Sequence, residues 1–121
     1  MAWGSDTAMT QLTTISDTEQ FFTTLTTLNP REIAHCQADV NFVGSTDDMI
    51  CSVYTTLDDT SEIWDDTSLF SILIDKGTDP HQISFVVGPG IYKFRIGMKS
   101  TGATDDHTSA DLRFRVDGVS A

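Results

Sequence analysis

The stretch YKFRIGMK, residues 92–99, decides the fold class, because apolar side chains take every second position along it. These apolar residues are Tyr92, Phe94, Ile96 and Met98. Successive side chains of a β-strand point to opposite faces of its sheet. The stretch therefore predicts a strand that buries one face and exposes the other to water.

Six further segments show the same period and are separated by clusters of turn-forming residues. The clearest is IAHCQADVNF, residues 33–42, which has apolar residues at alternate positions from Ala34 onward. The remaining strands are predicted at residues 21–28, 49–57, 69–74, 83–87 and 110–116. No segment has a convincing helical period. Strands of this length and spacing predict an all-β fold, an antiparallel β-sandwich of about seven strands of the immunoglobulin or fibronectin kind.

The start of the 92–99 strand adds a specific expectation. Immunoglobulin-like sandwiches often place a Tyr there, whose hydroxyl bonds back across the corner, and Tyr92 follows Gly90 and Ile91 at this point. The inter-sheet disulfide of antibody domains is not expected, because Phe94 occupies the position of its second cysteine.

The chain has the size of one domain. With 121 residues and 39% hydrophobic composition it can bury one core. The first residues are small and polar without sustained periodicity, apart from Trp3. We therefore expect residues 1–17 to form an N-terminal arm that orders against a partner, and residues 18–121 to form the sandwich domain.

Charge and hydropathy exclude several classes of function. The 18 acidic residues outnumber the seven Lys and Arg, and the net charge of -11 repels nucleic acid and anionic membranes. No apolar run approaches the roughly 20 residues that span a bilayer, and the first residues lack a signal-peptide pattern. We expect a soluble chain that binds neither nucleic acid nor membrane and is not exported by the general secretory route.

Four pairs of aspartates pose the sharpest question of chemistry. LDDTSEIWDDTSLF, residues 57–70, carries two pairs, and Asp47-Asp48 and Asp105-Asp106 are the others. Asp side chains from adjacent loops can bind calcium, and paired carboxylates can hydrolyse glycosides. Each pair lies where a strand ends, however, and Asp next to Ser or Thr caps backbone donors in turns. Turn chemistry is the favoured interpretation, and no metal site is predicted.

No other residue type forms a recognisable catalytic or ligand-binding motif. The three histidines are scattered, and no phosphate-binding loop or nucleophile motif is present. Cys36 and Cys51 are expected to be buried free thiols, because a chain of this size builds its own core. We therefore predict neither enzymatic activity nor a cofactor.

The basic residues are distributed unevenly. Five of the seven lie at outward positions of the last two long strands: Lys93, Arg95, Lys99, Arg113 and Arg115. If these two strands pair as a hairpin, they form a basic stripe on an otherwise acidic protein. The stripe either protects the sheet by cross-strand charge pairing or docks against an acidic partner. We assign these five residues, together with Trp3, to a candidate interface.

Three stretches carry a family resemblance. They are MAWGSDTAMTQ at 1–11, SVYTTLDDTSEIWDDTSLFSILIDKGTDP at 52–80, and GIYKFRIGMKSTGATDD at 90–106 followed by RFRVDGVSA at 113–121. In size and texture the chain resembles the small all-β virion proteins of tailed bacteriophages. The resemblance covers most of the chain without a diagnostic motif.

The resemblance implies a structural virion protein that is assembled in the host cytoplasm. Such proteins are often capsid decoration or cement proteins, which bind and stabilise the phage head shell. The implied partners are the major capsid protein, copies of the chain itself in a homo-oligomer on the particle, or both. The alternative is a carbohydrate-binding sandwich module of a phage tail or fibre. In that alternative Trp64 is an exposed stacking platform rather than a hairpin anchor.

Overall fold

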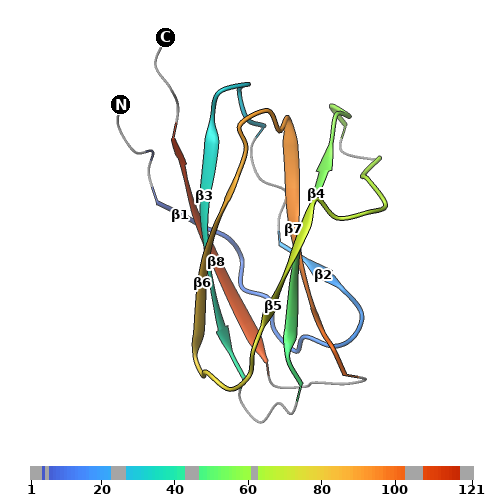
Figure 1. The fold of residues 1–121 in the computed structure, drawn as a ribbon, viewed down its shortest axis with the longest axis vertical. Helices are drawn as coiled ribbons and strands as arrows, with labels where there is room; N and C mark the ends of the chain where they lie inside the picture. Colours follow the sequence, from blue (N-terminus) through green and yellow to red (C-terminus); the bar gives the residue numbers. More distant parts are fainter. Residues whose placement is uncertain are drawn as a thin grey trace.

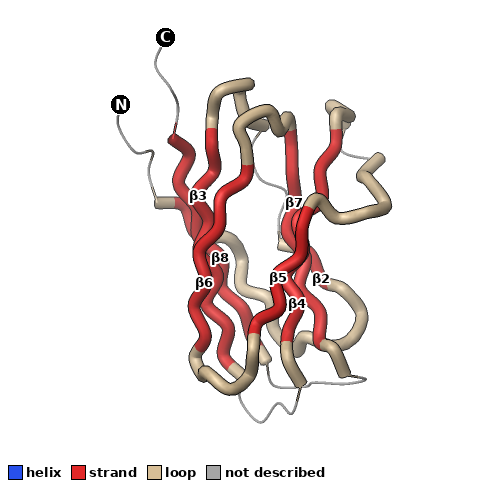
Figure 2. Tube along the Cα trace, viewed as in Figure 1, coloured by secondary structure: helices blue, strands red, loops and turns tan. Residues whose placement is uncertain are grey.

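A computed structural model describes Gly4 and residues 6–22, 27–42, 47–60, 63–102 and 108–117. All regular structure in these ranges is β-strand (Figure 2). The described part of the chain accordingly has no helix of the length and hydrophobicity needed to cross a bilayer.

Eight strands form two four-stranded antiparallel sheets (Figure 1). Sheet A has the order β1-β8-β3-β6, and sheet B has the order β2-β7-β4-β5. The strands are β1 (Thr7–Ala8), β2 (Gln20–Phe21), β3 (Ile33–Asn41), β4 (Met49–Thr56), β5 (Phe70–Ile74), β6 (His81–Val87), β7 (Lys93–Ser100) and β8 (Ser109–Asp117). The predicted all-β antiparallel sandwich is confirmed.

The strand order of this sandwich is that of a jelly roll and differs from the expected immunoglobulin or fibronectin order. Consecutive strands change sheet at every connection except the one between β4 and β5. Eight strands in two sheets with crossing connections are typical of jelly rolls. In this arrangement β7 and β8, which are neighbours in the sequence, lie in opposite sheets.

The core lies between the two sheets and is built by the period-two pattern. Along β3 every second residue is buried, from Ala34 to Val40. On β7 the side chains of Phe94, Ile96 and Met98 are buried in the same way. The alternation that predicted these strands therefore also identified the residues that fill the core.

The N-terminal segment completes the sandwich. Strand β1 pairs with β8, and Leu12 forms a further β-bridge with Ala110. Ile15 is fully buried in the core. The described part of residues 1–17 is thus ordered within the sandwich, in contrast to the expected arm that orders against a partner.

The edge strand predicted at residues 21–28 overlaps β2 only at Phe21. At the two ends of the segment, the N–H of Phe22 donates to the carbonyl oxygen of Ile96 (2.9 Å) and that of Leu28 donates to Tyr92 (2.8 Å). Phe22 and Leu28 therefore both lie beside the β7 side of sheet B, and residues 23–26 lie outside the described residues.

The corner at Tyr92 differs from the expected one. The Tyr92 hydroxyl donates a hydrogen bond to the carboxylate of Asp59, in the connection between β4 and β5. It therefore ties a distant loop to the start of β7, whereas the immunoglobulin-type corner bonds to backbone a few residues upstream.

Candidate protein–protein interface

The predicted basic stripe is split between the two faces of the sandwich. Strand β7 pairs with β4 and β2, and β8 pairs with β3 and β1, so the two strands form no hairpin. Lys93, Arg95 and Lys99 therefore belong to sheet B, whereas Arg113 and Arg115 belong to sheet A. The condition for a single stripe, pairing of the last two strands, is not met.

On sheet A the two arginines are bound by the N-terminal segment. The Arg113 guanidinium pairs with the Asp6 carboxylate at 3.2 Å, and both side chains are substantially exposed. The Arg115 guanidinium donates to the carbonyl oxygen of Gly4 at 3.0 Å. These contacts hold the N-terminal segment beside β8, and an exposed pair of this kind contributes up to about 1 kcal/mol.

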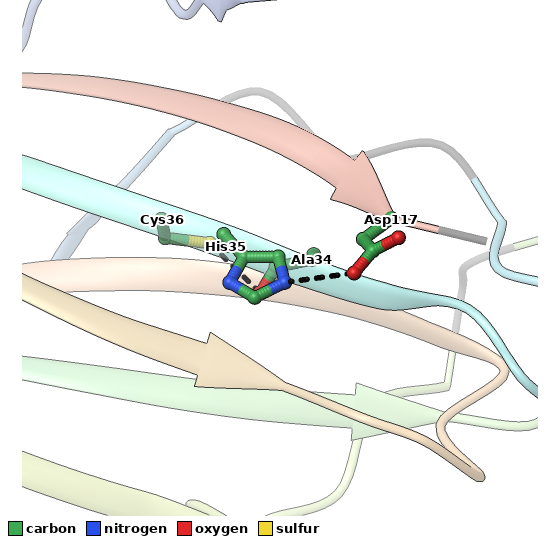
Figure 3. Close-up of polar contacts among 4 residues, drawn as sticks. All are labelled: Ala34, His35, Cys36 and Asp117. Atoms are coloured by element: carbon green, nitrogen blue, oxygen red, sulfur yellow. Dashed lines mark hydrogen bonds and ion pairs between the residues drawn. The ribbon is translucent and has the colours of Figure 1, made fainter. Parts of the chain in front are cut away.

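A second polar contact lies on the same face of sheet A. His35 on β3 points toward Asp117 at the end of β8, with 3.7 Å between Nε2 and Oδ2 (Figure 3). His35 also lies opposite Arg115 in the sheet register. This end of the face thus holds an Arg and a His, with the carboxylate of Asp117 beside His35.

On sheet B the side chain of Arg95 lies among aromatic rings. Its guanidinium carbon is 3.7 Å from the ring centroid of Phe21, 4.7 Å from that of Trp64 and 5.9 Å from that of Tyr54. Such cation–π contacts contribute about 0.5–2 kcal/mol each. Arg95 thereby joins the 57–69 connection to the outer face of β7, which supports the interpretation of Trp64 as an anchor.

The other predicted interface residues are Lys93, Lys99 and Trp3. The Lys93 ammonium donates to the carbonyl oxygen of Asp59 at 3.0 Å and so supports the same connection as Arg95. Lys99 is partly exposed on β7. Trp3 lies outside the described residues.

Two of the aspartate pairs contribute a carboxylate that binds loop backbone, Asp48 and Asp58. Four Asp carboxylates accept hydrogen bonds from backbone N–H groups of the loops: Asp48, Asp58, Asp75 and Asp79. Within the described ranges no group of three or more His, Cys, Asp or Glu has an arrangement that suits a metal ion. The hydrogen bonds support the turn interpretation; Asp105-Asp106 lies outside the described residues.

Asp58 is the most heavily used of these carboxylates and provides a test. It accepts hydrogen bonds from the N–H of Ile63 at 3.1 Å, the N–H of Thr60 at 3.2 Å and the hydroxyl of Thr60 at 2.9 Å. We expect Asp58→Ala to lower the free energy of unfolding by about 1–2 kcal/mol in urea denaturation, because partly exposed bonds are lost.

The matched control is Asp66→Ala. Asp66 is exposed in the same connection, and its replacement should change the free energy of unfolding by less than about 0.5 kcal/mol.

Calcium and a chelator should leave the melting temperature of the wild type unchanged. A rise of several degrees with calcium would show a tight site and contradict the turn interpretation.

Both cysteines of the sequence are free and buried, as expected. Burial raises the pKa of the Cys36 thiol to about 12, and burial, followed by the charges of Cys36 and Glu19, raises that of Cys51 to about 12. The Cys36 thiol faces the carbonyl oxygen of Ala34 at 4.0 Å (Figure 3). Such thiols are protonated and shielded, so they are unreactive in the folded protein.

Sequence reasoning missed the flank formed by β5 and β6. These strands are the edges of sheets B and A, and the 75–80 turn joins them. Edge strands normally carry charges, prolines or bulges that prevent pairing with other chains. FSILI and HQISFVV contain no Asp, Glu, Lys, Arg or Pro. This lack of charge is the signal in the sequence that would have identified the flank.

The flank also exposes apolar surface. The inward-facing side chains nearest to the edge are only partly buried: Phe70, Ile72, Ile83 and Phe85. On the outer faces Leu73 of β5 is 62% exposed and Val86 of β6 is 52% exposed. We call these two strands with these six side chains the β5–β6 flank. Exposed apolar side chains gathered along one edge of a fold are typical of interaction sites.

The comparisons with known proteins bear on the fold. Among solved structures, the chain is similar to a protein of the Bacillus endospore appendages, which are described as a family of disulfide-linked pili. The TM-score is 0.51 and the identity 15%, over 97% of this chain and 93% of that chain. No protein-family model matches the sequence, and no curated protein does. At this identity the likeness shows a shared fold.

Proposed function

We propose that the chain is a structural subunit of an extracellular or virion-associated assembly and acts through protein–protein contacts, without catalysis. The observation that carries the proposal is the uncharged, partly apolar β5–β6 flank. A protein with a net charge of -11 has many charged residues that could protect its sheet edges, yet the edge strands β5 and β6 contain no Asp, Glu, Lys or Arg. Surface of this kind is suited to contact with another protein.

Two likenesses support the proposal. The neighbour of similar fold belongs to appendages described as pili, which are repeating protein assemblies. Jelly rolls also occur in viral capsid proteins and in lectins, although a fold by itself does not define a function. The particular form that we propose is the one implied by the phage resemblance, a capsid decoration protein that binds the head shell.

The proposed mode of assembly differs from the disulfide linkage named for the neighbour. The sequence has two cysteines, and both are buried in the core. Disulfides between subunits would require the folded domain to open. Non-covalent contacts between surfaces, including strand edges, are therefore the proposed linkage for this chain.

The proposal is tested by quantitative mass spectrometry of purified virions and extracellular appendages from a culture that produces the protein. We expect the chain in many copies per particle, in a fixed ratio to the major structural protein. Recovery only in the soluble fraction, at substoichiometric amounts, would contradict it. Binding to cell-surface sugars that is lost in Trp64→Ala would instead favour the carbohydrate-binding alternative.

A further inference from the structure

We propose that β6 of one copy pairs with β6 of a second copy, antiparallel and about a two-fold axis at Ser84. The two copies of sheet A then form one continuous sheet across the interface. This inference rests on the proposed structural function and specifies the contact through which copies join. It commits to a second copy of this chain as the occupant of the β5–β6 flank.

The β6 edge of sheet A is open along its length in the described structure. The seven residues of β6 pair with β3 on one side, and no described strand pairs with the other side. At the opposite edge of the sheet, β1, the Leu12 bridge and the backbone bond of Gly4 to Val116 border β8. In the strand orders of the two sheets, β6 and β5 are the edges opposite β1 and β2. Addition of a strand is therefore favoured at β6.

Strand β6 is complementary to a second copy of itself. With Ser84 at the axis, Ile83 of one copy lies opposite Phe85 of the other, on the inner side of the sheet. Aromatic and β-branched residues form favourable cross-strand pairs, and two small Ser side chains meet at the axis without crowding. On the outer side, Val86 lies opposite Gln82. Every pair joins uncharged or apolar groups.

Antiparallel pairing also separates the acidic turns of the two copies. The acidic turn that contains Asp75 and Asp79 precedes β6, whereas the uncharged Gly88-Pro89-Gly90 follows it. An antiparallel pair therefore places the acidic turns of the two copies at opposite ends of the interface. This arrangement minimises repulsion at close range between two chains that each carry a net charge of -11.

Partly exposed apolar side chains lie beside the β6 edge. Phe70 of β5 and Phe85 of β6 form an edge-to-face contact with 5.9 Å between the ring centroids. Both rings remain partly exposed along the flank. A second copy at the β6 edge covers this contact, so hydrophobic burial adds to the backbone hydrogen bonds of the paired strands.

The experiment measures self-association by sedimentation velocity over a range of protein and salt concentrations. We expect a monomer–dimer equilibrium that strengthens severalfold when salt is raised, because screening weakens the repulsion between two acidic copies. Backbone amides in residues 81–87 should exchange more slowly in the dimer. A monomer at all concentrations and salt conditions overturns the proposal, as does a dimer without added protection in these residues.

Charge at the axis tests the register. Ser84→Lys places two ammonium groups opposite each other and should weaken the dimer about tenfold or more. Ser84 is exposed, so the variant should fold normally, as checked by its melting temperature. Thr10→Lys, at an exposed position on the opposite flank, is the matched control and should dimerise as the wild type does.

Mixing two variants of opposite charge is the decisive experiment. Ser84→Glu alone should also dimerise poorly, whereas an equimolar mixture of Ser84→Lys and Ser84→Glu should form heterodimers with restored affinity. Dimerisation that is unaffected by either variant, or not restored by mixing, overturns the two-fold β6 contact. If the Ser84→Lys variant is incorporated into particles normally, the structural function is supported and the β6 contact is not needed for it. If the purified protein forms the β6 dimer but is absent from particles, the β6 contact is supported and the proposed structural function is contradicted.

Discussion

Phe94→Ala is expected to lower the free energy of unfolding by about 3–5 kcal/mol, which is a large part of the stability of a small domain. Phe94 lies on β7 at the centre of sheet B, is 0% exposed, and is the largest of the fully buried side chains in the described ranges. Its removal leaves a cavity between the two sheets. Close-packed sheets relax only partly around such a cavity, so both burial and contacts are lost.

The measurement is urea denaturation followed by circular dichroism, with Leu57→Ala as the control. Leu57 is 87% exposed, so the same loss of apolar atoms should cost less than about 0.5 kcal/mol there. Equal destabilisation by the two variants would show that Phe94 is not in a close-packed core. Such a result would contradict the assignment of the inner face of β7.

The second large effect is a loss of stability at alkaline pH. The pKa of both buried thiols is about 12 in the folded chain, whereas an exposed thiol has a pKa near 8.5. A raised pKa means that the folded state holds protons that the unfolded state has released. Stability is therefore full below about pH 8.5 and is lost as the pH rises toward 12.

The expected loss is on the order of 3 kcal/mol for each thiol by pH 11. Urea denaturation at pH 7, 9 and 11 measures it, and the Cys36→Ala, Cys51→Ala double variant should show a much weaker dependence. Tyr54 contributes in the same direction, because burial and then its bond to Glu19 raise its pKa, so Tyr54→Phe separates that contribution. A double variant with the pH dependence of the wild type would contradict the role of the thiols.

The strands were predictable because the signal for them is local. Alternation in residues 33–42 and 92–99 reports which side chains face inward, and the structure buries Ala34, Val40 and Phe94 accordingly. Turn chemistry is local as well. Asp58 and Asp75 accept hydrogen bonds from backbone groups two residues away, so turns can be predicted at these Asp-rich stretches without knowledge of the fold.

The candidate interface was less predictable, because it depends on which strands share a sheet. Outward positions for Arg95 and Arg113 follow from alternation, but a common stripe required β7 and β8 to pair. The connection between them crosses from one sheet to the other, so their basic residues lie on opposite faces. The chain sequence contains no local pattern that distinguishes a crossing connection from a hairpin.

The sequence by itself determined the all-β class, the inward faces of the long strands, the buried thiols and the role of Asp58 as a turn former. Only the tertiary structure decided the jelly-roll order, the covering of β8 by the N-terminal segment and the exposure of β6 at a sheet edge. The physical reason is the distance along the chain over which each kind of interaction acts. Side-chain alternation and turn hydrogen bonds act over a few residues, whereas the order of strands in a sheet depends on packing between segments far apart in the chain.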